Sequence, residues 1–98
     1  IDGGCPIINT AIEADDNYPM LRIKVVRVMG IIKDSIKKII NRGIQENQIK
    51  KDILVDEFAL TFYAAIEGAI LISRVEGDTE TYSLVRKNLE KQIKEISI

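Results

Sequence analysis

The sequence predicts an all-α protein, an antiparallel helical bundle of three long helices preceded by one short N-terminal helix. Apolar residues recur at intervals of three and four along most of the 98-residue chain, the spacing that gathers them on one face of a helix. Glycines, prolines and runs of acidic residues interrupt this pattern at a few points only. No stretch alternates apolar and polar residues in the way that predicts a half-buried strand. A chain of this length forms one domain at most.

The short helix is expected from about Cys5 to Ala14. It follows a pair of glycines, and Pro6 is tolerated near its start because the first turn of a helix does not use its N–H groups. Asp15, Asp16 and Asn17 end it. The sequence therefore predicts a brief apolar helix and a polar break before the first long helix.

The second helix is expected from Tyr18 to Asn47, with Pro19 in its first turn. Gly30 and Gly43 each cost about 1 kcal/mol relative to alanine inside a helix, so each is expected to mark close packing or a bend. One apolar stripe runs along the helix, made of Leu21, Val25, Val28, Met29, Ile32, Ile36, Ile39, Ile40 and Gly43.

The third helix is expected to begin near Val55 and to stop at Glu76, before Gly77. Thr79 is expected to cap the fourth helix with its side chain. The fourth helix then carries a clear apolar stripe that ends near the C-terminus, made of Tyr82, Val85, Leu89, Ile93 and Ile96.

The third helix is apolar on two faces, which argues for a second chain. A helix buried nearly all round belongs to the middle of an assembly, and three other helices can hardly enclose it in so short a chain. A monomeric bundle centred on this helix is the alternative. One face is expected to be core and carries Val55, Phe58, Ala59, Phe62, Ile66, Ala69 and Ile70. The other is expected to form a symmetric dimer interface with part of the fourth helix, and the residues assigned to it are Thr61, Ala64, Ala65, Gly68, Ile72, Val75, Val85, Leu89 and Ile93.

Composition excludes several function classes. The formal net charge is −1, from 14 basic and 15 acidic residues, so no basic stripe predicts binding to nucleic acid or to a membrane surface. The chain has no histidine and one cysteine, so we expect no zinc site, no internal disulfide and no cofactor. No apolar run is expected to reach the length that spans a bilayer, and no signal peptide is recognisable at the start of the sequence. These features agree with a cytoplasmic location.

Four short segments, in this order, resemble the C-terminal regulatory domain of TetR-family transcriptional regulators. They are Gly4-Cys5-Pro6, Pro19-Met20-Leu21-Arg22, Gly43-Ile44 leading to Gln48-Ile49 and Asp52, and Ala65-Ile66-Glu67-Gly68-Ala69. The resemblance implies a homodimeric one-component repressor that releases DNA when a small hydrophobic effector binds. It also implies that the last two helices build the dimer, and that the helix-turn-helix precedes Ile1 and is absent, as in a fragment. Leu54 departs from the family pattern, which often has a capping Asp or Ser there, so this helix start is expected to fray.

Candidate effector-binding residues each have a structural alternative. Cys5 and Asn9 lie one turn apart, and either a ligand contact or local packing explains them. Tyr63 and Glu67 are neighbours at i and i+4, and are either the polar groups that orient an effector or part of a solvated seam or an interface hydrogen bond. Three apolar residues either line the same pocket or belong to the core: Met29, Phe62 and Ile66.

Two other functions remain open from the sequence. A small dimeric enzyme of the chorismate-mutase type requires basic groups that converge on an anionic substrate, and Arg74 is the arginine that lies in a largely apolar helix. No set of nucleophile, base and orienting group is recognisable, so an enzyme is not expected. A helical dimerisation module without a ligand differs from a regulatory domain only in lacking an internal cavity.

Overall fold

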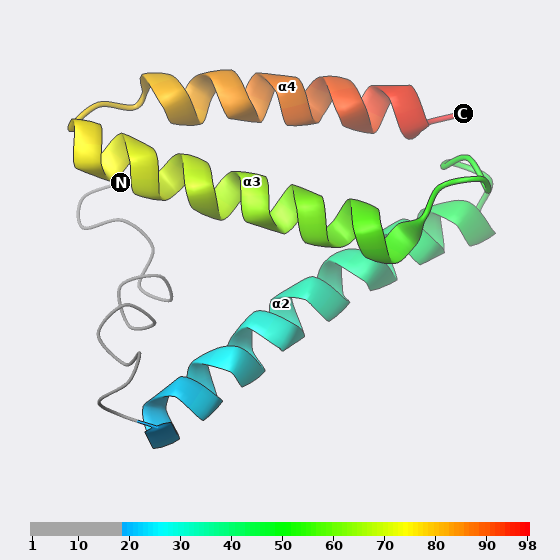
Figure 1. Ribbon diagram of the computed structural model, residues 1–98. Coiled ribbons are helices and arrows are strands. Elements are labelled where there is room, and N and C mark those ends of the chain that lie inside the picture. Colours follow the sequence, from blue (N-terminus) through cyan, green and yellow to red (C-terminus); the bar gives the residue numbers. More distant parts are fainter. Residues whose placement is uncertain (1–18) are drawn as a thin grey trace.

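The computed structural model describes residues 19–98, and within this range the chain is all α-helical, as predicted. Helix α2 comprises Pro19–Gln45, α3 comprises Val55–Glu76 and α4 comprises Glu80–Ile96. In Figure 1, α3 lies between the other two helices, and it packs against both. The expected helix over residues 5–14 lies outside the described residues.

The three helices lie side by side in a single layer. The smallest principal extent is 16 Å, little more than the diameter of about 10–12 Å of one helix with its side chains. A single layer leaves two broad faces uncovered, so the core is thin. Within the described part of the chain no large side chain is fully buried, and the buried apolar residues are Val25, Ile40, Ala59, Ala69 and Leu89.

Helix α2 begins at Pro19, where a proline is tolerated, and ends two residues before the predicted Asn47. The chain leaves the helix because Asn47 adopts a left-handed conformation with φ 60°, which asparagine tolerates better than most residues. The stripe predicted along α2 is only partly covered. Leu21, Val28 and Ile39 lie along one edge of it and remain exposed, Ile39 to 70%.

Gly43 allows the connector after α2 to fold back onto the helix. The amides of Gln48 and Ile49 both donate to the Gly43 carbonyl, at 2.8 and 3.1 Å. A Cβ at position 43 would lie 2.5 Å from Cδ1 and 2.8 Å from Cγ1 of Ile49, so Gly43 marks close packing. A Cβ at Gly30 would meet nothing within 4 Å, so close packing does not explain that glycine.

The connector also holds the end of α4. The Lys50 amide donates to the Ile96 carbonyl at 2.8 Å, and the Ile98 amide donates to the Gln48 carbonyl at 3.0 Å. These two bonds form an isolated antiparallel bridge between Ile49 and Ser97. The end of α4 is thereby joined to the connector between α2 and α3, the end at which Figure 1 shows α2 and α3 closest together.

The turn between α3 and α4 differs from the prediction in how α4 is capped. Gly77 is left-handed at φ 80°, and its amide donates to the Ser73 carbonyl, which ends α3 as expected. The prediction of a Thr79 side-chain cap is wrong, because Thr79 has ψ 8° and makes no cap hydrogen bond, whereas an N-cap residue is usually extended. Instead, Asp78 Oδ1 accepts from the Glu80 amide at 3.0 Å.

The neighbouring helix α3 supplies a second hydrogen-bond acceptor for the amides in the first turn of α4. Ser73 Oγ accepts from the Tyr82 amide at 2.9 Å, which satisfies one of the N–H groups that the first turn of a helix leaves without an intrahelical partner. Ser73 is a buried polar residue at 9% exposure. At the other predicted helix start, Leu54 makes no side-chain cap, as the departure from the family pattern led us to expect.

Candidate effector site and outer helix face

The outer face of α3 is apolar and uncovered. Of the seven residues predicted for the core-facing side of this helix, Ala59 and Ala69 are buried and the other five are half-buried. On the opposite side, Ile72 is 48% exposed and Val75 79% exposed. Leu60 is exposed on this side too, to 53%. Among the other residues predicted for this face, Thr61 and Ala64 are exposed, and Ala65 and Gly68 are half-buried.

The residues of α4 that were assigned to the same interface are divided by the structure. Leu89 is 4% exposed, and Val85 is half-buried, so both pack largely within the chain. Ile93 is 41% exposed. Among the residues predicted for the interface, the exposed ones therefore all lie on α3 apart from Ile93 of α4.

Helix α3 also corrects the expectation that no segment is long and apolar enough to span a bilayer. By length and composition alone α3 is such a segment, and among the described residues no other helix is. Core helices of soluble proteins have the same composition. The sequence interpretation overlooked this because Glu67 and Arg74 interrupt the apolar run.

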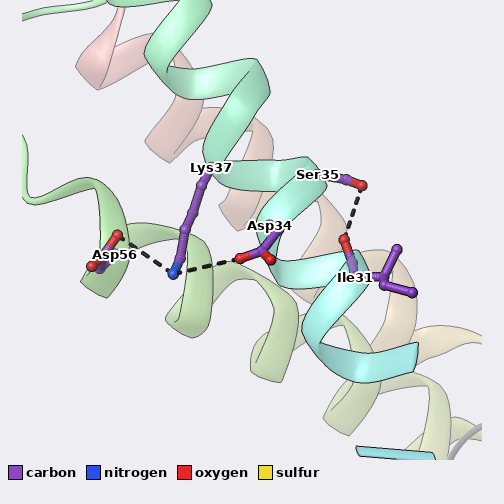
Figure 2. Close-up of polar contacts among 5 residues, drawn as sticks. All are labelled: Ile31, Asp34, Ser35, Lys37 and Asp56. Atoms are coloured by element: carbon purple, nitrogen blue, oxygen red, sulfur yellow. Dashed lines mark hydrogen bonds and ion pairs between the residues drawn. The ribbon is translucent and has the colours of Figure 1, made fainter. Parts of the chain in front are cut away.

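The polar residues of α3 form one stripe along the helix. Tyr63, Glu67 and Arg74 follow Asp56 by 7, 11 and 18 residues. Because each residue turns the helix by about 100°, these spacings place all four side chains within about 20° of their mean direction around the helix axis. Lys37 of α2 fixes that direction, because its Nζ lies 3.6 Å from Asp56 Oδ1 and 3.9 Å from Asp34 Oδ1 (Figure 2). The Asp56 end of the stripe therefore lies within reach of α2, although Asp56 and Arg74 are themselves exposed.

Glu67 is the residue of this stripe without a polar contact. Its Oε2 is buried and has no hydrogen-bond partner, and no ion pair with another described residue involves it. Asp56 is paired with Lys37, and Tyr63 and Arg74 each have an interaction partner. Burying an unsatisfied carboxylate oxygen is costly, so Glu67 is a candidate binding group.

The position of Glu67 along α3 places it opposite the N-terminal half of α2. Eleven residues separate it from Asp56, about 16 Å along the helix axis. The same rise along the antiparallel α2, counted back from Lys37, ends between Val25 and Met29. Val25 is buried and Met29 is half-buried. In Figure 1, α2 diverges from α3 toward this end.

The apolar residues predicted to bind an effector are not all on this side. Phe62 precedes Ser73 by 11 residues, so the two lie on nearly the same side of α3. Ser73 contacts α4, which places Phe62 on the α4 side of the helix. The ring of Phe62 stacks on that of Phe58 with centroids 6.0 Å apart, which favours a role in packing. Ile66 is half-buried between the two directions. The predicted effector residues Cys5 and Asn9 lie outside the described residues.

Other chemistries find little support in residues 19–98. No group of three or more acidic or cysteine side chains is arranged to hold a metal ion there. All five arginines are exposed; Arg42 pairs with Glu46 just after the end of α2, and Arg86 pairs with Glu90 within α4. A surface arrangement of this kind is unlike the convergent basic groups that the chorismate-mutase alternative requires.

Comparison with known proteins identifies the family. The family described as "Tetracyclin repressor-like, C-terminal domain" matches residues 1–89. No curated protein matches the chain. A TetR-family transcriptional regulator from Cytophaga hutchinsonii has a solved structure that superposes with a TM-score of 0.92 at 38% identity, covering 98% of this chain and 48% of that one.

A TetR transcriptional regulator from Chloroflexus aurantiacus is similar, with a TM-score of 0.90 at 34% identity over 97% of this chain and 48% of that one. The chain thus spans about half the length of each of these regulators. Together with the helical layer and the matched region, these similarities show that the chain belongs to the family of C-terminal domains of TetR-like regulators.

Proposed function

We propose that this chain is the effector-sensing and homodimerisation domain of a one-component, cytoplasmic TetR-like repressor. In this proposal, a small hydrophobic effector binds between α2 and α3, and the change in helix positions releases a DNA-binding domain from its operator. The observation that carries the proposal is the uncovered apolar face of α3, in a chain that belongs to this family. The domain itself is not an enzyme in this proposal.

The outer face of α3 supports a symmetric dimer for a physical reason. Large side chains such as Ile72 and Val75 are exposed in the single chain, and an apolar surface of this kind is stabilised when a second copy covers it. A two-fold axis would set the same face of each copy against the other. Gly68 and Ala64 keep the centre of this face small, so two helices can approach closely.

Sedimentation equilibrium over a broad concentration range tests the dimer. We expect the protein to sediment as a dimer and Ile72→Glu to weaken association by a factor of about 30 or more, because burying an unpaired carboxylate in an apolar interface should cost about 2 kcal/mol or more. Ile39→Glu is the matched control, since Ile39 is 70% exposed on α2. A monomeric parent, or equal dissociation of both variants, would refute the proposal.

An internal effector site distinguishes a regulatory domain from a dimerisation module without a ligand. Glu67 and Met29 are placed at one level of α3 and α2 by counting along the helices from the Lys37–Asp56 contact, and the buried Oε2 of Glu67 without a hydrogen-bond partner favours the regulatory alternative. A thermal-shift screen of small amphiphiles is the direct test. A dimer that no amphiphile stabilises would favour the ligand-free module.

A further inference from the structure

The chemical class of the effector follows from the unsatisfied carboxylate of Glu67. Resting on the proposed function, we infer that the site between α2 and α3 takes a small amphiphile whose polar end is a protonated amine, and that Glu67 binds this ammonium group. The buried Oε2 accepts no hydrogen bond in the described structure. A carboxylate accepts hydrogen bonds and donates none, so the group that completes it must be a donor.

The residues around Glu67 indicate the chemistry of the rest of the ligand. Counted along the helices from the Lys37–Asp56 contact, the α2 residues nearest in level to Glu67 are Val25 and Met29, a buried valine and a half-buried methionine. Toward the connector, Lys37 is already paired with Asp34 and Asp56, and neither Lys37 nor Lys33, one turn nearer, forms an ion pair with Glu67. An apolar body contacting the α2 side chains and one cationic end at Glu67 match this arrangement.

The negative charge of Glu67 distinguishes between the possible polar groups of the ligand. A carboxylate on the ligand would repel Glu67, and burying two like charges together is unfavourable. A hydroxyl supplies a neutral donor, whereas an ammonium supplies a donor with a full positive charge, which attracts the carboxylate in addition to the hydrogen bond. The site is therefore expected to rank an amine first, an alcohol second and a carboxylate last.

Three probes of equal chain length test this order. We would measure binding of n-octylammonium, n-octanol and n-octanoate by titration calorimetry, well below their micellar concentrations, to the parent protein and to Glu67→Gln. We expect octylammonium to bind about tenfold more tightly than octanol in the parent, in line with a charge-assisted hydrogen bond. Glu67→Gln should remove this advantage and leave octanol binding unchanged.

Glu57→Gln is the matched control, because Glu57 is exposed on the same helix. Thermal unfolding without any probe gives an independent readout. An unpaired buried carboxylate is destabilising, so Glu67→Gln should have the same Tm as the parent or a higher one. A marked fall in Tm would show that Glu67 has a structural partner and would overturn the inference.

The outcomes separate this inference from the proposed function. If octanol and octanoate bind as well as octylammonium, the effector site stands and its preference for an amine is refuted. The preference is also refuted if Glu57→Gln loses as much affinity as Glu67→Gln. If none of the probes binds while the dimer persists, the effector site itself is refuted and the inference falls with it.

Discussion

Replacing Gly43 by alanine tests whether the fold of the connector depends on the missing side chain. A Cβ at this position would lie 2.5 Å from Cδ1 and 2.8 Å from Cγ1 of Ile49. Ile49 has little freedom to withdraw, because its own amide donates to the Gly43 carbonyl. The flanking amides of Lys50 and Ile98 hold the connector to the end of α4. The Ile49 side chain must therefore leave its rotamer or the bridge must shift.

Two opposing terms set the magnitude of the effect. Alanine is favoured over glycine inside a helix by about 0.5–1 kcal/mol. Forcing an extra carbon into a packed contact costs about 1–3 kcal/mol. The expected net loss of unfolding free energy is about 1 kcal/mol, which lowers the Tm of a domain of this size by about 4–8 °C.

Thermal and urea unfolding of matched variants provide the assay. Gly30→Ala is the control, since its Cβ would meet nothing within 4 Å, and it should gain about 0.5–1 kcal/mol. In an Ile49→Ala background the nearest remaining Ile49 atom is Cβ, at 3.5 Å, so Gly43→Ala should become stabilising there. If Gly43→Ala stabilises the parent as much as Gly30→Ala does, the close contact with Ile49 has no energetic effect and the reasoning is wrong.

Two further variants examine the polar contacts between helices. Ser73→Ala should lower the unfolding free energy by about 1 kcal/mol, because the Tyr82 amide loses its acceptor in a partly buried place; an unchanged urea midpoint would show that water replaces the hydroxyl. Asp56→Asn should change stability by less than about 0.5 kcal/mol, because the Asp56 carboxylate is 84% exposed and its ion pair with Lys37 is weakened by solvent; a larger loss that disappears in 1 M salt would contradict this.

Local sequence rules predicted the helices because each helix is determined mainly by short-range interactions. The apolar period, Pro19 and Gly77 placed both ends of the long segments within two residues of the structure. Such signals depend on the backbone geometry of a few neighbouring residues, so they are readable without knowing what the helices contact. The two apolar faces of α3 followed from the same period.

The error at Thr79 shows where local rules stop. A threonine before a helix is a common cap, but the acceptors that α4 uses are Asp78 and Ser73. Ser73 lies nine residues before Tyr82, on another helix. No sequence pattern indicates this contact, because it exists only once α3 and α4 are packed together.

For the candidate site too, the sequence determined some features and the tertiary structure determined the others. The sequence by itself determined that Tyr63 and Glu67 share a side of α3, because i and i+4 are neighbours on any helix. Only the tertiary structure decided that the Asp56 end of this side lies within reach of Lys37 of α2, and that Phe62 belongs to another side. Burial of Glu67 Oε2 without a partner also arises from packing. Helical periodicity specifies which residues lie together on a helix, whereas the partner of each face depends on contacts between distant segments.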